Sequence, residues 1–331
     1  MAPRPRDVVV VGASAGGVEA LRTMVAGLPV DLRASVLVVL HMPAGGTTAL
    51  AAILNRVGTL PAATARNGEP LEHGRIYVGR PDHHLLVMDD LVALSHGPTE
   101  NGHRPAINAL FRSAAIARGA SVTGVLLSGV LDDGVAGLHA IAGRGGRTVV
   151  QDPDDAIYRS MPEHALRSLT PDHVVPAFEI GDVLNKISNE NVEPTNNHTA
   201  SELLRWENEI ASVGWTSEGA ETVGTPSEFS CPDCQGVLSG IDVDFEGGRR
   251  YRCRVGHAWT SEALLAAQGS ALERALWTAL RTLEEKTALS LRMAEHARER
   301  GNLVIAERYN RLAHETTEAS EVLRRQIAGS G

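Results

Sequence analysis

The sequence predicts an α/β fold: a doubly wound, mainly parallel sheet with helices on both faces. Two observations favour this class. Short apolar runs rich in β-branched residues recur along residues 1–187, each bounded by glycine, proline or aspartate. Between several of these runs lie helical patterns, at Val18–Gly27, Thr48–Val57 and Ala106–Arg118. Strands that alternate with helices are typical of parallel sheets covered on both faces.

The expected strands are DVVVVG, ASVLVVLH, GRIYVG, HLLVM, VTGVLLSG and GRTVVQD. One region departs from the alternation. The stretch IYVGRPDHHLLVMDDLVAL is typical of a hairpin or meander rather than of a strand–helix–strand unit. We therefore expect some antiparallel pairing, which would make the main sheet mixed.

Three further segments are expected after the α/β domain of residues 1–187. Residues 188–230 are polar and acidic, and most of them are typical of a linker, within which ASELLRWENEIAS has the pattern of a single helix. Residues 231–260 contain all the cysteines and indicate a small metal-stapled knot. Residues 261–331 have a helical pattern interrupted by a turn at Arg300–Asn302, which predicts an antiparallel helical hairpin.

Composition excludes some classes of function. The 331 residues carry a formal charge of −9, of which −7 belongs to residues 188–230 with one basic and eight acidic side chains. This balance argues against a general binder of nucleic acid or of anionic membranes. Because no apolar run approaches roughly 18 residues and no signal-like segment opens the chain, we expect a cytoplasmic protein without membrane insertion.

The stretch VVVVGASAGG raises the first question of chemistry. It contains the pattern G-x-S-x-G around Ser14, at the end of a predicted buried strand. Such an elbow presents a serine as a nucleophile in some hydrolases, but it also suits a phosphate-binding turn or simple close packing. A dinucleotide site is disfavoured because the G-x-G-x-x-G spacing is absent.

Partners for a nucleophilic serine follow other strands. His41 ends VLVVLH, and Asp132 and Asp133 follow VTGVLLSG. The carboxyl ends of parallel strands lie on one edge of a sheet, so a serine, a histidine and an aspartate would meet there as a Ser–His–Asp triad requires. Taken singly, the histidine also suits a structural role, and either aspartate suits a cap of the next helix.

Collinear motifs carry a family resemblance. They are VVVGASAGGVEAL, LVVLHMP, GRIYVGRPDHHLLV, HRPAINALFRSAA, GVLLSGVLDDGVAGL, GGRTVVQDP and SMPEHAL. On these stretches, residues 8–187 resemble the catalytic domain of the chemotaxis-receptor methylesterases, the protein-glutamate methylesterases. The family's nucleophile then falls on Ser14, its histidine on His41 and its aspartate on Asp133 rather than on Asp132.

The resemblance implies a function. The substrate would be a glutamyl γ-methyl ester of a methyl-accepting chemotaxis receptor, and glutamine deamidation is a second family activity. The backbone N–H groups of Ala15 and Gly16 would stabilise the oxyanion, and no cofactor would be needed for catalysis. Arg104 in GHRPAIN would contact an acidic receptor surface, with a structural salt bridge as the equal alternative.

The sequence also departs from the family pattern. The usual T-G-M-G-x-D-G is SGVLDDG here, with Val130 at the methionine and Leu131 at the second glycine. A leucine does not adopt a positive φ cheaply, so a reshaped loop is expected. Asn108 stands at the acidic position of the usual RPSVD. The family's receiver domain has no room ahead of a catalytic strand that starts at residue 7, so control by phosphorylation in cis is not expected.

The cysteines form a spaced set with one histidine. Cys231, Cys234, Cys253 and His257 give C-x2-C-x18-C-x3-H, which is typical of a zinc ribbon with a closed, structural site. Free thiols packed in a small core are the alternative. Because all four candidate ligands come from the protein, we expect metal loss to unfold the knot and to leave ester hydrolysis largely intact.

Two functional classes follow. The first is a serine carboxylic-ester hydrolase that demethylates a chemotaxis receptor. The second is a catalytically weakened signalling regulator that keeps the fold and binds partners through its C-terminal zinc and helical module. The sequence does not identify the partner of that module.

Overall fold

The computed structural model describes residues 4–46, 49–192, 200–213, 224–242 and 249–328. The chain divides into two compact units, Met1–Leu264 and Leu265–Gly331. The α/β part, the acidic segment and the cysteine-containing segment therefore belong to the same compact unit. The module boundaries at residues 187, 230 and 260 remain our proposal for how the sequence is divided.

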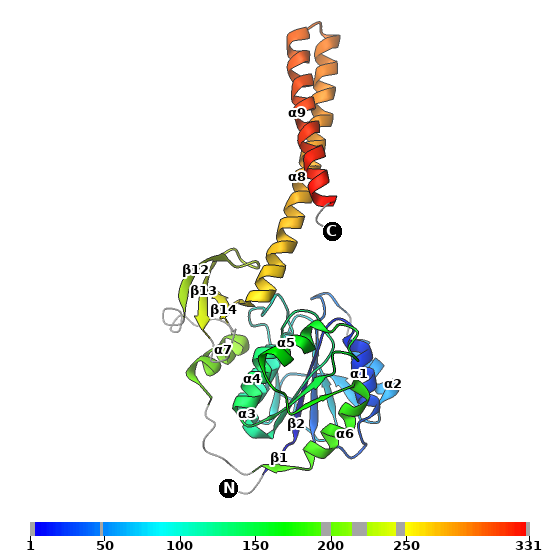
Figure 1. Cartoon of the computed structure of the whole chain (residues 1–331), viewed down its shortest axis with the longest axis vertical. Coiled ribbons are helices and arrows are strands. Elements are labelled where there is room, and N and C mark those ends of the chain that lie inside the picture. Colours follow the sequence, from blue (N-terminus) through cyan, green and yellow to red (C-terminus); the bar gives the residue numbers. More distant parts are fainter. Residues whose placement is uncertain (1–3, 47–48, 193–199, 214–223, 243–248, 329–331) are drawn as a thin grey trace. The chain divides into compact units, whose positions relative to one another are not determined.

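The first unit is built around a parallel sheet of seven strands (Figure 1). In spatial order the strands are β10 (His173–Val175), β9 (Arg147–Gln151), β8 (Val122–Leu126), β2 (Val8–Ala13), β3 (Ser35–Leu40), β5 (Ile76–Val78) and β4 (Ala62–Thr64). The central strand β2 pairs in parallel with β3 on one side and with β8 on the other. The order of strands therefore reverses at β2, and the carboxyl ends around such a switch point are where open α/β sheets place their sites.

Helices cover both faces of this sheet because side chains alternate along each strand. Val9 and Val11 of β2 pack in one apolar core, and Val8 and Val10 pack in the other. The first core is completed by α1 (Gly17–Ala26), α2 (Ala49–Val57) and α6 (Ala177–Ser188). The second is completed by α3 (Ile107–Arg118), α4 (Val135–Gly143) and α5 (Ser160–Ser168). The doubly wound fold expected from the sequence is confirmed.

The expectation of a mixed main sheet is wrong for the described residues. The hairpin of β6 (His84–Met88) and β7 (Leu91–Ser95) forms a separate two-stranded antiparallel sheet. Its Leu85, Val87 and Val92 join the second apolar core, so the hairpin is held by packing rather than by pairing with β5. A further short pair joins β1 (Arg4–Pro5) to β11 (Asn191–Val192).

The acidic segment contributes one helix, α7 (Glu202–Val213), as the sequence pattern predicts. It buries Glu207, Ile210 and Ala211, and Ala211 joins a small core with α3 and β6. After it comes a four-stranded antiparallel sheet, the ribbon, made of β12 (Thr225–Ser230), β13 (Val237–Asp242), β14 (Arg249–Cys253) and β15 (Ala258–Thr260). The helix and the ribbon pack within the same compact unit as the parallel sheet.

The second unit is a helical hairpin, as expected. It is formed by α8 (Ser261–Glu299), whose first turn belongs to the first unit, and α9 (Leu303–Ala328), with the turn at the predicted position. The buried seam of the hairpin consists mostly of small residues, spaced three, four or seven positions apart within each helix: Ser290, Ala294, Ala297, Ala306, Ala313, Thr316 and Ser320. Small side chains at coiled-coil spacing let two helices approach closely.

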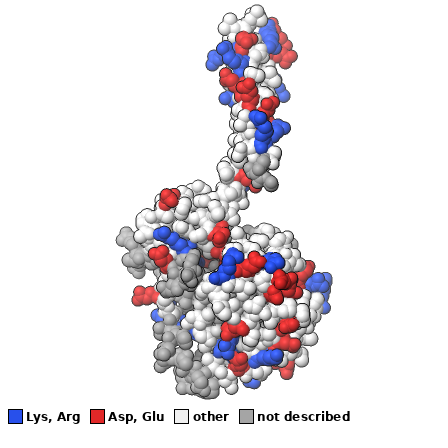
Figure 2. Space-filling model, viewed as in Figure 1, with Lys and Arg blue, Asp and Glu red and all other residues white. Residues whose placement is uncertain are grey.

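Charge on the surface is mixed. On the face drawn in Figure 2, acidic and basic side chains are interspersed on the hairpin, and no large patch of one sign forms there. No helix in the described ranges is both long enough and apolar enough to cross a membrane.

Candidate active site

Three polar side chains that follow separate strands lie together at the carboxyl edge of the main sheet. Ser14 comes directly after β2, His41 directly after β3, and Asp133 lies between β8 and α4. The ladder between β2 and β3 continues to the site itself, because the His41 N–H donates to the carbonyl of Ala13 at 3.0 Å. Pairing of the neighbouring strands therefore sets the separation of the serine and the histidine.

His41 bridges the other two residues. Its Nε2 lies 2.7 Å from Asp133 Oδ2, and its Nδ1 lies 3.2 Å from Ser14 Oγ. A carboxylate only accepts hydrogen bonds, so the Nε2 carries the proton and Nδ1 is left to accept from the serine hydroxyl. The structure thus brings together the three residues that the sequence singles out, in the order that serine activation by a neighbouring base requires.

Asp133 is buried at the N-terminus of α3. Its carboxylate accepts the backbone N–H of Ile107 at 2.7 Å and that of Asn108 at 3.3 Å. Burial by itself would raise the pKa of Asp133, but the hydrogen bond and charge of His41, with the N–H of Ile107, outweigh it and hold the pKa below its usual range. Asp133 is therefore ionised at neutral pH and suited to stabilise a charged imidazole.

The turn that presents Ser14 depends on small residues. A Cβ at Gly12 would lie 2.2 Å from the Ile107 side chain, so α3 packs directly against the strand end. Gly16 has φ +69°, and a Cβ there would meet Ile157 and the Ser128 hydroxyl at 2.8 Å. This left-handed residue directly precedes α1, which points its N-terminus toward the serine. Ala15 and Gly16 occupy the position expected of the oxyanion donors, a role that stays a prediction.

The loop before Asp133 keeps a conformation that usually belongs to glycine. Leu131 has φ +61°, so it adopts the positive φ that a leucine was expected to avoid. The loop remains compact, since Gly129 still approaches Ser14 so closely that a Cβ there would lie 2.9 Å from the Ser14 Cβ. The departure from the family pattern is therefore accommodated as backbone strain, and Asp133 still reaches His41.

Asn108, which replaces an acidic residue of the family pattern, supports the same loop. Its Oδ1 accepts the N–H groups of Gly134 at 3.1 Å and Gly137 at 2.8 Å. An amide oxygen performs this capping role as a carboxylate oxygen does. Its Nδ2, however, is buried without a hydrogen-bond partner.

Sequence reasoning missed His103. Its ring stacks on His41 with centroids 3.7 Å apart and an interplanar angle of 16°. Burial, together with the charge of His41, lowers the pKa of His103 to about 4, so the ring is neutral at physiological pH. A second positive charge beside the imidazolium is thereby avoided. The signal available in the sequence was only that His103 precedes Arg104 in the matched motif GHRPAIN.

Asp132 also differs from expectation, because the sequence suggested that either aspartate suits a cap of the next helix. Its half-buried carboxylate instead accepts the hydroxyl of Thr260 at 2.8 Å through Oδ1. Burial raises the pKa of Asp132, and the neighbouring Asp133 charge adds to this effect against the hydrogen bond from Thr260. The two adjacent aspartates therefore have different partners, and only Asp133 contacts His41.

Arg104 has partners within the protein. Its Nε donates to Asp82 Oδ1 at 3.0 Å, and its Nη1 donates to the Gly97 carbonyl at 2.9 Å. These contacts correspond to the structural salt bridge, the alternative to a receptor contact that the sequence left open. They also tie the segment that carries His103 to the β6–β7 region.

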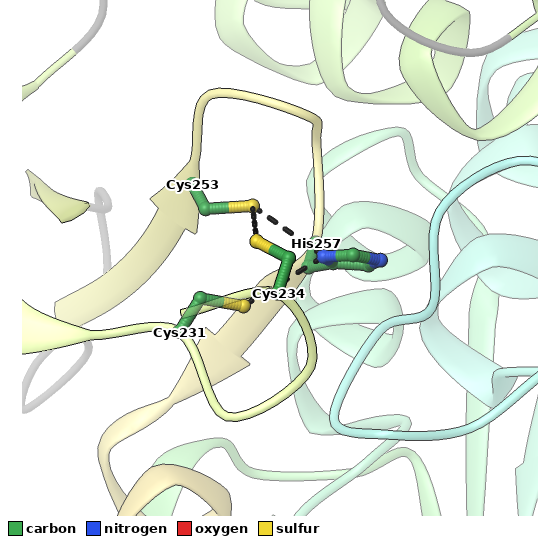
Figure 3. A group of neighbouring side chains, drawn as sticks. All are labelled: Cys231, Cys234, Cys253 and His257. Atoms are coloured by element: carbon green, nitrogen blue, oxygen red, sulfur yellow. Dashed lines mark hydrogen bonds between the residues drawn. The ribbon is translucent and has the colours of Figure 1, made fainter. Parts of the chain in front are cut away.

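The four residues with metal-ligand spacing converge (Figure 3). Cys231 and Cys234 lie between β12 and β13, Cys253 is the last residue of β14, and His257 lies between β14 and β15. Their ligand atoms all lie within 4.8 Å of one another, with the Cys234 and Cys253 sulfurs 3.6 Å apart and His257 Nδ1 3.5 Å from the Cys253 sulfur. A tetrahedral zinc site has edges of about 3.8 Å between sulfurs and about 3.6 Å between sulfur and nitrogen. The residues therefore fit zinc.

Comparisons with known proteins match the α/β part of the chain. A family model described as CheB methylesterase matches residues 9–184. The catalytic domain of the CheB methylesterase from Thermotoga maritima, a crystal structure, superimposes with a TM-score of 0.52 at 29% identity and covers 54% of this chain and 97% of that domain.

Curated relatives match just over half of the chain. The chain is 38% identical over 192 residues to protein-glutamate methylesterase/protein-glutamine glutaminase 4 of Geobacter metallireducens, covering 57% of this chain and 55% of the relative. It is 34% identical over 190 residues to protein-glutamate methylesterase/protein-glutamine glutaminase 2 of Methanosarcina mazei, covering 55% and 52%. The chain spans about half the length of these relatives. With more than half of its residues matched by the family model and with the corresponding fold, the chain belongs to the CheB methylesterase family.

Proposed function

We propose that this protein is a cytoplasmic serine carboxylic-ester hydrolase that removes methyl groups from glutamyl γ-methyl esters of methyl-accepting chemotaxis receptors and deamidates receptor glutamines. The observation that carries the proposal is the hydrogen-bonded series from Ser14 through His41 to Asp133. Membership of the CheB methylesterase family supports the substrate class.

The first half of the reaction forms an acyl-enzyme. Ser14 Oγ attacks the ester carbonyl carbon while His41 Nδ1 takes the hydroxyl proton. Asp133 stabilises the imidazolium through Nε2, and N–H groups at the start of α1, from Ala15 and Gly16, stabilise the oxyanion. The tetrahedral intermediate then collapses, the C–O bond to the methoxy group breaks, and the proton on Nδ1 passes to the departing methanol.

The second half restores the enzyme. A water molecule gives a proton to His41 Nδ1 and attacks the acyl carbon, and the bond to Ser14 Oγ breaks as the proton returns to the serine. The product is the free glutamate side chain. With glutamine as substrate, ammonia leaves in place of methanol, and the same deacylation gives glutamate.

The test is methanol release from methylated receptor membranes by the purified chain, with Ser14→Ala as the matched inactive variant. We expect release by the wild type and none above background by Ser14→Ala. Equal release by both would remove Ser14 from the mechanism. A wild type that binds receptor but releases no methanol would favour the alternative of a weakened regulator. The intact contacts of His41 argue against that alternative.

We further propose that Cys231, Cys234, Cys253 and His257 hold one structural zinc ion. Four protein ligands close the coordination sphere, so the metal would stabilise the two ligand loops and would not act on substrate. Metal analysis of the purified chain should give about one equivalent of zinc, and Cys231→Ser should give much less. Wild-type protein that contains no zinc after purification without chelator would refute the assignment.

A further inference from the structure

The ribbon is joined to the candidate active site by backbone pairing. The Asn101 N–H donates to the Ala258 carbonyl at 2.7 Å, and the Ala258 N–H donates to the Thr99 carbonyl at 3.2 Å. The segment around Glu100 therefore lies beside β15 as a parallel neighbour. The ring of Trp259 in β15 packs against Gly102, where a Cβ would lie 3.3 Å from the indole.

Asn101 links that pairing to the catalytic carboxylate. Its Oδ1 accepts the backbone N–H of Thr260 at 2.9 Å, which fixes the orientation of the amide. Its Nδ2 then points to Asp133 and lies 3.4 Å from Oδ1. Asn101 is buried and has φ +53°, a left-handed conformation that asparagine tolerates better than most residues. One side chain thus joins a residue of the ribbon to Asp133.

An ionic cluster fixes the ribbon in this position. Glu100, next to Asn101, accepts a hydrogen bond from Arg112 of α3 and lies 3.5 Å from Arg250 of β14. Glu207 of α7 accepts hydrogen bonds from Arg250 at 2.7 Å and Arg252 at 3.1 Å. All five side chains are buried. Arg250 and Arg252, which belong to the basic stretch of residues 249–254, are therefore paired with glutamates inside the protein.

The proposed zinc site borders this contact. His257 immediately precedes β15, and its carbonyl accepts the Cys253 N–H at 3.0 Å. Gly256, in the same ligand loop, has φ +99°, and a Cβ there would lie 2.7 Å from Pro98. The loop that carries two metal ligands therefore rests on the segment that leads to Asn101. Because binding energy at a small zinc site is largely folding energy, metal loss would release β15.

We propose that Asn101 is a positioning residue for Asp133 and that the zinc-stapled ribbon holds Asn101 in place, so that zinc occupancy sets the reactivity of Ser14. This inference rests on the proposed function of the same site. It also replaces the expectation that metal loss leaves ester hydrolysis intact. That expectation treated the cysteine-containing segment, residues 231–260, as separate from the α/β domain.

The test measures Ser14 directly with an alkyl fluorophosphonate, a serine-reactive probe that needs no receptor. The full chain is labelled with zinc bound and after chelation, as wild type and as Asn101→Gly. Glycine is chosen because it adopts φ +53° without strain. Asp89→Gly is the matched control, since Asp89 is an exposed residue with the same φ in the β6–β7 turn.

We expect about tenfold slower labelling on chelation of the wild type, recovery when zinc is returned, and about tenfold slower labelling of Asn101→Gly with zinc bound. Chelation should then slow Asn101→Gly little further, because both changes act through the same contact. Asp89→Gly should behave as wild type. The NMR resonance of the His41 Nε2 proton should shift in Asn101→Gly and in the chelated wild type, which a merely structural asparagine would not cause.

The outcomes separate the two proposals. Labelling that depends on neither zinc nor Asn101 would overturn this inference and leave the proposed function standing. The same holds if the effects of chelation and of Asn101→Gly on the labelling rate multiply, because the two changes would then act independently. Zinc-dependent labelling without methanol release would overturn the proposed substrate and leave this inference standing. A wild type whose Ser14 does not react at all would overturn both. If chelation unfolds the whole chain, the labelling and NMR of zinc-bound Asn101→Gly still decide the role of Asn101.

Discussion

Thr260 and Asp132 lie 128 positions apart in the sequence, yet the hydroxyl of Thr260 donates to the carboxylate of Asp132 at 2.8 Å. The same hydroxyl accepts the N–H of Ala263 at 3.1 Å and so caps the first turn of α8. One threonine therefore connects the end of the ribbon to the loop that carries Asp133. This contact occupies the Asp132 carboxylate and supports the different roles that we propose for the two adjacent aspartates.

Substitution of the two aspartates should separate those roles. Asp133→Asn should lower kcat by about 10⁴-fold, because an amide does not hold the imidazole in the required tautomer or stabilise its charged form. Asp132→Asn should retain most of the activity, since its amide oxygen still accepts from Thr260. The measurement is methanol release from methylated receptor, with circular dichroism to verify folding. The reverse ranking would assign the orienting role to Asp132.

Leu131 offers a test of strain in the same loop. At φ +61° a leucine costs roughly 1–2 kcal/mol relative to a residue without a Cβ. Leu131→Gly should therefore raise the free energy of unfolding by about 1 kcal/mol, after the entropy that glycine adds to the unfolded chain. Urea denaturation measures the change. Leu131→Ala is the control and should give no such gain, so a gain shared by both variants would mean that the side chain, and not the backbone, is strained.

The sequence predicts those parts of the site that follow from local patterns, but it does not predict those that depend on contacts between distant segments of the chain. Ser14, His41 and the pair Asp132 and Asp133 were found because each follows a strand, and the alternation of strands and helices places strand ends on one edge. The choice of Asp133 over Asp132 came from the family resemblance. Asn101 and His103 were missed because their roles arise only from packing against Thr260 and His41. An Asn-Gly pair by itself indicates nothing more than a turn.

The ribbon was predicted only in part for the same reason. The spacing of its cysteines and histidine in the sequence reveals the metal ligands. The packing of the ribbon against the rest of the first unit leaves no such local pattern. The buried pairs of Glu207 with Arg250 and Arg252 join residues 43 and 45 positions apart, and in the sequence these residues look like surface charges of a linker and a basic hairpin. Only a buried partner of opposite charge distinguishes such residues from solvated ones.

His103 predicts a pH dependence of stability. The pKa of His103 in the folded protein, about 4, lies below the ordinary histidine value of 6.5, so the unfolded chain binds a proton first as the pH falls. The contribution of His103 is complete above pH 6.5 and is lost between 6.5 and 4, with a slope of at most about 1.4 kcal/mol per pH unit. His103→Gln should flatten the unfolding free energy in this window. If the wild type and the variant have parallel profiles there, the ring is accessible to protons in the folded state.

Glu207 tests whether α7 and the ribbon are integral to the first unit. Burial alone would raise the pKa of Glu207, but Arg250 and Arg252 outweigh it and lower the pKa below its usual range. Glu207→Gln removes a negative charge from a buried group of three arginines and two glutamates, and it leaves Glu100 to balance Arg112, Arg250 and Arg252. Breaking a buried ion pair in this way costs roughly 3–5 kcal/mol. Glu209→Gln, an exposed position on the same helix, is the matched control and should have little effect.

The dependence of the unfolding free energy on pH below 7 provides the second half of that test. Because the pKa of Glu207 is lowered in the folded protein, its contribution to stability is present above the ordinary glutamate pKa of 4.5 and is lost as the pH falls below that value. The difference in unfolding free energy between wild type and Glu207→Gln should therefore be largest near pH 7 and should shrink below pH 4.5, whereas Glu209→Gln should track the wild type throughout. Urea titrations at pH 7 and pH 4 measure both. A constant difference would attribute the loss to packing rather than charge, and no difference at either pH would mean that α7 does not dock against the ribbon in solution.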